Sequence, residues 1–307
     1  MSKPHWPYYH NITLKMNDDK KVSAIPSGTF MIGGDLSVNR LGFGAMRITG
    51  SGIWGPPDNK AEAIKVLRCL PGLDVNFIDT ADSYGPNVSE ELIAEALHPY
   101  PKGMVIATKG GLTRPGPNQW KPDGRPEYLR STLEGSLKRL KVERIDLYQL
   151  HRIDAAVPME ESLGVLKEAQ EQGLIRHIGL SEVSVEQLEK ASKIVKVTTV
   201  QNMYNLAERR WENTLRWCEE NGVGFIPWYP LSAGSIHTQK VLGKVAQKHG
   251  ASEYQVALAW LLQNSPVMLP IPGTSSSAHL EDNVGAASLS LDEEDMQALD
   301  TPGESAD

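Results

Sequence analysis

Short apolar runs alternate along this chain with longer segments of helical periodicity, and this alternation constrains the fold most. Eight runs have the length of buried strands: Leu41–Gly44, Val75–Ile78, Met104–Ala107, Ile145–Leu150, Ile175–Leu180, Thr198–Val200, Val223–Ile226 and Val267–Ile271. The segments between them include Ala61–Leu70, Glu90–Leu97, Tyr128–Leu140, Met159–Glu171 and Val185–Val195, which have the spacing of amphipathic helices. Ser184 and Gln187 have the spacing of a capping box at the start of the last of these helices. Strands that alternate with helices predict an α/β fold with a parallel sheet.

Eight strand-helix units within about 270 residues fit a closed barrel better than a doubly wound sheet. The dinucleotide-binding fingerprint of doubly wound folds is also incomplete here. Gly42 and Gly44 follow a strand, but Arg47 stands where the fingerprint requires its third glycine. We therefore predict a (β/α)8 TIM barrel, in which any nucleotide is held by another kind of site.

The segment before the first barrel strand has the pattern of a β-hairpin. Gly28–Met31 and Leu36–Asn39 flank a Gly-rich connection, which is typical of a tight turn between antiparallel strands. We expect this N-terminal β-hairpin to plug the barrel. Residues 1–26 are then an N-terminal extension, and residues 27–307 form a single barrel domain.

Composition narrows the class of function. The net charge of −7 gives no basic excess for binding nucleic acid or an anionic membrane. The longest apolar stretch, Val256–Leu262, is too short to span a bilayer, and the first 21 residues have no apolar core of a secretory signal. The histidine and cysteine spacings of known metal sites are missing, so no metal is expected. We expect a cytoplasmic protein that acts on a small molecule, and the oligomeric state stays open.

Four reactive side chains stand at the carboxyl ends of predicted strands, where barrel enzymes gather their functional groups. Asp79 closes the second strand, and Tyr84 follows in its loop. Lys109 closes the third strand and His151 the fourth. Each residue alone also has an ordinary interpretation: a helix cap, a packing aromatic, a surface charge and a buried histidine.

Together these four residues form an acid suited to carbonyl reduction. A phenol titrates near pKa ~10, and an adjacent ammonium such as Lys109 would lower the pKa of Tyr84. Asp79 would hold the lysine, while His151 would orient the substrate oxygen or relay its proton. No side chain supplies a hydride, so the constellation implies a nicotinamide cofactor.

The residues around these positions resemble the aldo-keto reductase family over about Ser27 to Leu299. The strongest match is Asn76-Phe77-Ile78-Asp79-Thr80-Ala81-Asp82-Ser83-Tyr84-Gly85 followed by Ser89-Glu90-Glu91, which resembles the signature around the catalytic Asp and Tyr. The resemblance continues through Thr108-Lys109, Asp146–His151, Ile178–Ser181, Val200–Asn202, Pro230–Gly234, Ile271–Thr274 and Asp282-Asn283. The register as a whole is similar to a microbial branch that includes pyridoxal reductases.

The resemblance implies a cofactor site at the matching positions. Ser181 and Gln201 would bind the nicotinamide carboxamide, and Trp228 would stack on the ring. Small residues would line the pyrophosphate at Leu231, Ser232 and Gly234. The adenosine phosphate would lie before a short helix at Gly273, Thr274, Ser275 and Ser276. The adenine would be surrounded by His279, Asp282 and Asn283.

Three positions depart from the family pattern. Glu182 replaces the usual Asn, so an acceptor-only carboxylate meets the carboxamide unless it points elsewhere. Gly273 and His279 stand where many members place a Lys and an Arg for the 2′-phosphate. We expect NADPH as the preferred cofactor, with NADH also possible.

We interpret the chain as an NADPH-dependent oxidoreductase that reduces a small aldehyde or ketone, with pyridoxal as one candidate. Trp54 and Trp120, in loops after the first and third strands, would form an aromatic wall for a planar substrate or would simply anchor those loops. Two alternatives remain: a nucleotide-sensing, aldo-keto-like regulatory subunit without significant turnover, and a barrel hydrolase that uses a metal. The intact set of four residues disfavours the first, and the missing metal motifs disfavour the second.

Overall fold

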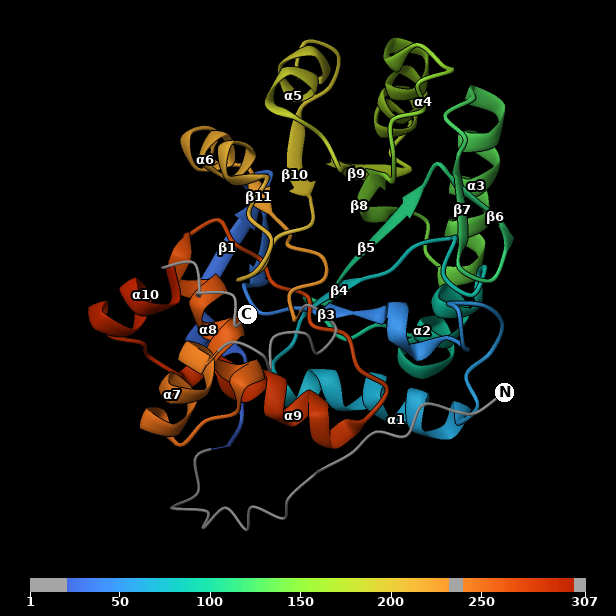
Figure 1. Ribbon diagram of the computed structural model, residues 1–307. Coiled ribbons are helices and arrows are strands. Elements are labelled where there is room, and N and C mark those ends of the chain that lie inside the picture. The colour runs from blue at the N-terminus through green and yellow to red at the C-terminus, as the bar shows by residue number, and fades with distance from the viewer. Residues whose placement is uncertain (1–20, 232–239, 301–307) are drawn as a thin grey trace.

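Seven parallel strands form a curved sheet at the centre of the molecule, in the order β11-β10-β9-β8-β5-β4-β3 (Figure 1). The computed structural model describes residues 21–231 and 240–300, and every structural statement below refers to these residues. The strands of this sheet are β3 (Phe43–Gly44), β4 (Phe77–Asp79), β5 (Val105–Gly110), β8 (Ile145–Leu150), β9 (Ile175–Ser181), β10 (Val197–Gln201) and β11 (Gly224–Phe225).

The sheet closes into a barrel through the segment predicted as the eighth strand, Val267–Ile271. Phe225 on β11 exchanges two backbone hydrogen bonds with this segment, of 2.7 and 2.8 Å. On its other side, the segment and the residue after it bond to β3 and the residue before it. The N–H of Gly42 donates to the carbonyl of Pro270 at 2.9 Å, and the N–H of Gly44 donates to the carbonyl of Pro272 at 3.3 Å. Proline has no N–H, so this segment cannot complete a regular ladder. The predicted strand is therefore a connection with one isolated bridge to Phe225, while the (β/α)8 fold itself is confirmed.

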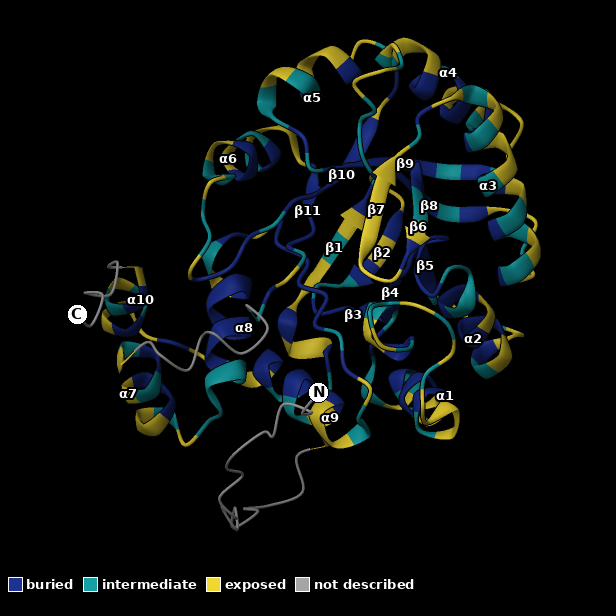
Figure 2. Cartoon of the chain, turned by 45° about the vertical axis from the view of Figure 1, so that its right-hand side comes forward, coloured by how far each residue is buried: buried dark blue, intermediate teal, exposed yellow. Residues whose placement is uncertain are grey.

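Helices surround the sheet and bury one face against it (Figure 2). In α3, buried Leu129, Leu133 and Leu140 recur with the spacing of one helix face. The helices are α1 (Lys60–Cys69), α2 (Val88–Leu97), α3 (Pro126–Leu140), α4 (Met159–Glu171), α5 (Val185–Ala191), α6 (Glu212–Asn221), α7 (Lys240–His249), α8 (Glu253–Asn264), α9 (Ser277–Gly285) and α10 (Glu293–Asp300).

The start of α5 confirms the predicted capping box, because Ser184 and Gln187 exchange side-chain and backbone hydrogen bonds. The helix ends at Ala191 rather than at Val195. Beyond Ala191, the N–H groups of Ile194 and Val195 bond back to its carbonyl oxygen in turns. The helical spacing of apolar residues in the sequence therefore extends to Val195, four residues beyond the end of the helix.

The N-terminal hairpin confirms the predicted plug. It consists of β1 (Thr29–Ile32) and β2 (Leu36–Asn39), paired antiparallel. Ile32 and Val38 are fully buried in an apolar cluster with residues of the barrel strands, among them Phe77. The loop between the strands needs left-handed backbone at Gly33 and Gly34, with φ of 65° and 95°, which glycine adopts without strain.

The residues just before the hairpin also contact the barrel. Ala24 is fully buried, and its N–H donates to the carbonyl of Leu73 at 2.8 Å. A short 3-10 helix spans Ile25–Ser27, so the predicted boundary between residues 26 and 27 falls inside a helix.

A second hairpin, β6 (Leu112–Gly116) and β7 (Gln119–Pro122), follows β5 and was not predicted. It places Trp120 on a strand rather than in an irregular loop. All four residues of β7 are exposed. A strand without a buried face does not need the alternation of apolar and polar residues by which strands are recognised in a sequence. The usable signal was the turn between the strands, where Asn118 adopts a left-handed φ of 55°.

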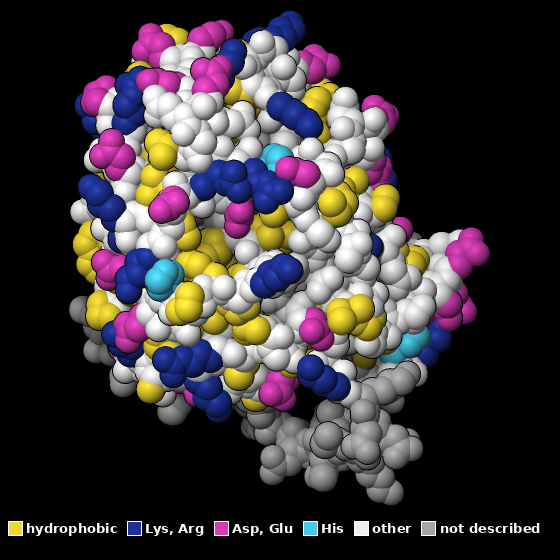
Figure 3. All heavy atoms as spheres, turned by 180° about the vertical axis from the view of Figure 1, so that it is seen from behind, with side chains coloured by type: hydrophobic (Ala, Val, Ile, Leu, Met, Phe, Trp, Pro, Cys, Tyr) yellow, Lys and Arg dark blue, Asp and Glu magenta, His cyan; other side chains and the backbone are white. Residues whose placement is uncertain are grey.

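Side chains of both charges are interspersed on the face shown in Figure 3, where Lys and Arg lie beside Asp and Glu. This mixture matches the small negative net charge. Among residues 21–231 and 240–300, no helix has the length and apolar character needed to cross a membrane.

Gly44 provides a test of barrel closure. A Cβ atom at this position would lie 2.6 Å from the carbonyl oxygen of Ile271, which is backbone and cannot swing away. We predict that Gly44→Ala lowers the free energy of unfolding by about 1–3 kcal/mol, as overpacking does elsewhere. Chemical denaturation would measure the change. Gly72→Ala is the control, because nothing lies within 4 Å of its added Cβ, and an equal loss in both variants would contradict this account.

Candidate active site

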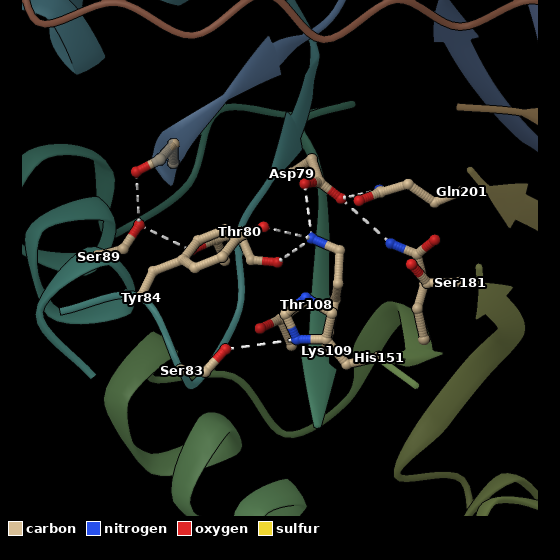
Figure 4. A network of polar contacts seen from close by, with 12 residues as sticks. Asp79, Thr80, Ser83, Tyr84, Ser89, Thr108, Lys109, His151, Ser181 and Gln201 are labelled. Atoms are coloured by element: carbon tan, nitrogen blue, oxygen red, sulfur yellow. Dashed lines mark hydrogen bonds and ion pairs between the residues drawn. The ribbon is translucent and has the colours of Figure 1, made fainter. Parts of the chain in front are cut away.

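The predicted residues Asp79, Tyr84, Lys109 and His151 meet at the carboxyl ends of the strands (Figure 4). Lys109 is at their centre. Its Nζ donates to Asp79 Oδ2 at 2.7 Å and to the carbonyl oxygen of Thr80 at 2.8 Å, and it lies 3.4 Å from the Tyr84 hydroxyl. The rings of Tyr84 and His151 are in edge contact, with 5.9 Å between their centroids.

Lys109 and Asp79 form a buried ion pair whose polar atoms are satisfied. Lys109 is 0% exposed and Asp79 is 1% exposed. The second carboxylate oxygen of Asp79 accepts hydrogen bonds from the side-chain amides of Gln149, at 3.1 Å, and Gln201, at 2.8 Å. Burial alone would lower the pKa of Lys109, but the Asp79 carboxylate and the Tyr84 hydroxyl outweigh it and raise that pKa above its ordinary value. The ammonium therefore keeps its charge.

Lys109 lowers the pKa of Tyr84 as expected, but the pKa as a whole is raised above its ordinary value. Burial of the phenol is the largest cause and raises its pKa, because a phenolate is poorly solvated there. Lys109 acts in the opposite direction but does not prevail. Tyr84 accordingly holds its proton, and the ammonium beside it can stabilise the phenolate once that proton has left.

His151 is a buried, neutral imidazole. Burial lowers its pKa well below the ordinary value, and the nearby cations Lys109, Arg152 and Arg114 lower it further. Its Nδ1 lies 3.3 Å from Ser83 Oγ. His151 is therefore suited to hydrogen bonding with a neutral ring rather than to acting as a cation.

The two predicted substrate tryptophans both lie near the guanidinium of Arg114. Trp120 contacts the Tyr84 ring edge-on, with centroids 6.3 Å apart. Arg114 is 3.7 Å from the centroid of Trp120 and 5.7 Å from that of Trp54. Its N–H groups bond to backbone carbonyls of both neighbouring loops, including that of Ser83 at 2.8 Å. Arg114 thus fixes an aromatic wall next to the phenol.

Ser181 and Gln201 pair in register at the ends of β9 and β10, so their side chains emerge side by side (Figure 4). Ser181 Oγ accepts a hydrogen bond from Arg152 at 2.9 Å. The Arg152 guanidinium also lies 6.0 Å from the Trp228 ring centroid. Two polar groups and an indole ring therefore surround one edge of the site.

Glu182, the first departure from the family pattern, turns toward Trp228. Its Oε1 accepts hydrogen bonds of 2.7 Å from the Trp228 indole N–H and from the backbone N–H of Met203. The backbone of Glu182 is left-handed, with φ of 55°, a conformation that Asn adopts more readily than Glu. The carboxylate thus holds the tryptophan in place.

The predicted phosphate-binding segment leads into α9. Ser276 caps this helix, and Thr274 Oγ1 accepts from the Ser276 N–H at 3.1 Å. Glu62 on α1 accepts from the N–H and the hydroxyl of Ser277, at 3.0 and 2.8 Å. These hydrogen bonds lower the pKa of Glu62, so a negative charge stands at the helix start.

Gly273, the second departure, faces the closure of the barrel. A Cβ there would lie 2.6 Å from the carbonyl oxygen of Gly44, so the close approach of the two backbones favours a glycine at this position. The neighbouring Ser275 is exposed.

The other predicted cofactor residues are placed as follows. His279 is exposed on α9, and Asn283 is 5% exposed. Asp282 Oδ2 accepts from Ser252 Oγ at 2.8 Å, so its carboxylate points to the start of α8. Leu231 is half-buried. Ser232 and Gly234 lie outside the described residues.

The model of the aldo/keto reductase family matches residues 40–303, well over half of the chain. The chain belongs to the aldo/keto reductase family. An uncharacterized oxidoreductase of Schizosaccharomyces pombe is 51% identical over 287 residues, 93% of each chain. Pyridoxine 4-dehydrogenase of Escherichia coli is 42% identical over 280 residues, 89% of this chain and 98% of the relative. Like the family, this reductase is an NAD(P)H-dependent oxidoreductase.

Solved structures show the same fold. A thermostable aldo-keto reductase in complex with epalrestat has a TM-score of 0.78 and 30% identity, over 89% of this chain and 99% of that chain. A glycerol dehydrogenase from Gluconobacter oxydans has a TM-score of 0.80 and 29% identity, over 89% and 94%. An aldo-keto reductase from Klebsiella pneumoniae in complex with NADPH has a TM-score of 0.75 and 24% identity, over 89% and 93%.

Several residues of the reductase site were missed from the sequence. Arg152 directly follows His151, and Gln149 stands two residues before His151 on β8. Both are close to the carboxyl end of a strand, where barrel enzymes place their functional residues, so they could have been predicted in the same way as His151. Arg114 and Ser83 gave no such signal, because their contacts depend on the second hairpin and on the fold of the Tyr84 loop. In the part of the chain that the structure describes, no group of three or more His, Cys, Asp and Glu residues is arranged for a metal ion.

A polar cavity of about 290 Å³ lies behind the Tyr84 loop. Its lining includes Asp82, Ser83, Tyr128 and Arg139. Asp82 is 5% exposed, and its Oδ1 has no hydrogen-bond partner among the described residues. Burial and then the negative charge of Glu90 raise the pKa of Asp82 to about 8. The folded reductase therefore keeps this carboxyl protonated at neutral pH.

The buried carboxyl predicts a specific dependence of stability on pH. Between pH 3.8, the ordinary pKa of an aspartate, and about pH 8, the folded chain holds a proton on Asp82 that the unfolded chain has released, so stability falls as pH rises. Asp82→Asn removes this effect. Relative to the parent, the variant should gain free energy of unfolding with rising pH, by at most about 1.4 kcal/mol per pH unit.

Denaturation of parent and variant at about pH 5 and about pH 7 would measure this gain. The exposed Asp58 provides the control variant, Asp58→Asn. A difference between Asp82→Asn and the parent that does not change with pH would show that Asp82 is ionised in the folded state.

Proposed function

We propose that this reductase converts a small aldehyde or ketone to the alcohol, with NADPH as the preferred cofactor and Tyr84 as the proton donor. One observation carries the proposal. The Lys109 ammonium, fixed by Asp79 at 2.7 Å, lies 3.4 Å from a buried Tyr84 hydroxyl that keeps its proton. A pure nucleotide-binding module has no need of this arrangement.

The chain supplies the proton and the orientation for the reaction. A bound nicotinamide supplies the hydride, which adds to the carbonyl carbon. Tyr84 donates its proton to the carbonyl oxygen, so that hydride and proton together give the alcohol. Lys109 stabilises the phenolate that remains, and His151 orients the oxygen. Asp79 keeps Lys109 in place through the exchange.

The residues at the nicotinamide end fit an aromatic ring that carries a carboxamide. The Gln201 amide nitrogen is used by Asp79, which leaves its oxygen to accept from an amide N–H. Ser181 Oγ accepts from Arg152 and keeps its own hydroxyl hydrogen to donate. Trp228, held by Glu182, offers a flat ring for stacking.

The remaining residues that match the family's cofactor contacts are proposed to bind the adenosine half of the cofactor. Leu231, with Ser232 and Gly234, is assigned to the pyrophosphate, and Gly273 with Thr274, Ser275 and Ser276 to the adenosine phosphate. His279, Asp282 and Asn283 are assigned to the adenine. The Glu62 carboxylate near the start of α9 opposes a phosphate there, so the preference for NADPH over NADH is modest.

The substrate class follows from the wall beside Tyr84. Trp120 and Trp54 suit a planar carbonyl compound, and Trp120 contacts the phenol directly. The relative that is 42% identical is named pyridoxine 4-dehydrogenase. Pyridoxal is therefore the first substrate to test.

Tyr84→Phe tests the proton donor. The variant keeps the ring but loses the hydroxyl, so turnover of pyridoxal should fall by about 10²-fold or more while NADPH affinity changes little. Loss of NADPH absorbance measures turnover, and quenching of tryptophan fluorescence measures binding. Tyr100→Phe is the control, because this hydroxyl bonds Leu140 O at 2.7 Å, away from the site. Undiminished turnover in Tyr84→Phe would remove Tyr84 from the mechanism.

We predict that the modest preference for NADPH over NADH becomes stronger when a permanent positive charge is placed at residue 279. An arginine on the 2′-phosphate adds a charge-assisted hydrogen bond of roughly 1.5–3 kcal/mol, so His279→Arg should raise the ratio of NADH to NADPH dissociation constants about tenfold or more. His98→Arg adds the same charge at an exposed position elsewhere. Equal ratios in the parent and His279→Arg would place residue 279 away from the phosphate.

A further inference from the structure

Ser83 is in contact with the catalytic histidine but has no part in the function proposed so far. Its Oγ lies 3.3 Å from His151 Nδ1, as the dashed line in Figure 4 marks. Both residues are buried, Ser83 at 2% and His151 at 5% exposure. The carbonyl of Ser83 accepts from Arg114 at 2.8 Å, so the serine is itself held in place.

The direction of this hydrogen bond decides which ring nitrogen of His151 carries the hydrogen. A neutral imidazole has one N–H and one acceptor nitrogen, whereas a hydroxyl can donate or accept. If Nδ1–H donated to Ser83, the hydroxyl hydrogen of this 2% exposed serine would have no protein acceptor, because Oγ has no other partner within residues 21–231 and 240–300. A buried donor without a partner is unfavourable, because it has given up its hydrogen bonds to water and gained none in the protein. If Ser83 donates, the donor left without a protein partner is the Nε2–H of His151, and this nitrogen is not among the fully buried unpaired atoms of the described residues, so it can bond to water or to a substrate.

We propose that Ser83 donates its hydroxyl hydrogen to His151 Nδ1 and thereby fixes the imidazole in the tautomer that carries hydrogen on Nε2. Ser83 is then a positioning residue, which acts on the substrate only through His151. Burial favours the neutral ring on which this tautomer depends, and the cations Lys109, Arg152 and Arg114 favour it further.

The consequence for catalysis rests on the proposed function. With Nε2–H and the Tyr84 hydroxyl, the site presents two hydrogen-bond donors to the carbonyl oxygen on which negative charge develops. In the other tautomer, the lone pair of Nε2 would face the lone pairs of that oxygen. A wrong tautomer would therefore weaken the transition state more than the bound substrate, and the loss would appear in kcat more than in KM.

The tautomer can be read without cofactor or substrate. In the ¹⁵N-labelled protein, the chemical shifts of the two ring nitrogens distinguish a nitrogen that carries hydrogen from one that does not. The His151 signals are assigned by their loss in His151→Gln. We expect hydrogen on Nε2 in the parent and in Ser83→Thr, which keeps the hydroxyl, and a mixture or the Nδ1–H form in Ser83→Ala.

Turnover gives the second readout. Ser83→Ala should lower kcat for pyridoxal about tenfold with little change in KM, and Ser83→Thr should restore most of it. Ser162→Ala is the matched control. It removes another buried hydroxyl, that of Ser162 on α4, which donates to the carbonyl oxygen of Gly124 at 2.7 Å. That variant should change neither the tautomer nor kcat.

Each outcome decides the proposal. Hydrogen on Nδ1 in the parent would overturn it, and so would an Nε2–H tautomer that is unchanged in Ser83→Ala. An Nε2–H tautomer that depends on Ser83, in a parent that reduces no carbonyl with NADPH, would support the role of Ser83 while refuting the proposed function.

Discussion

The buried pair of Lys109 and Asp79 is the interaction on which the rest of the site depends. Removing two charges from water costs several kcal/mol per ion, so such a pair persists only when its remaining polar atoms are satisfied. Here the partners come from different strands of the barrel: Thr80 follows β4, Gln149 lies on β8 and Gln201 ends β10. The pair therefore requires the closed sheet, and the closed sheet places the ammonium beside Tyr84.

The two ends of the barrel interior differ in composition: one end is apolar, and the other holds the polar residues of the candidate active site. At one end, the hairpin plug and the inward side chains of the strands form a buried apolar cluster that includes Ile32, Val38 and Phe77. At the other end, the polar residues around Lys109 replace that cluster. A polar network in the barrel interior is tolerable because its charged and amide donors find acceptors, and the apolar end carries the burial that offsets its cost.

Two of the three positions that depart from the family pattern are constrained by their local structure. Gly273 faces the carbonyl of Gly44 at the barrel closure, where any Cβ would be too close. Glu182 adopts a left-handed backbone that is unfavourable for its type by about 1–3 kcal/mol, and its hydrogen bonds to Trp228 and Met203 offset this cost.

The sequence by itself determined the strand-helix alternation, the hairpin plug and the four residues Asp79, Tyr84, Lys109 and His151 at strand ends. These features follow from local periodicity and from residue type at the end of a run, which a chain displays without folding. Only the tertiary structure decided the irregular eighth strand, the net rise in the pKa of Tyr84 and the second hairpin that carries Trp120. It also decided the direction of Glu182 and the contact of Ser83 with His151. Each of these depends on burial or on the distance between segments far apart in the chain, and no local pattern encodes either quantity.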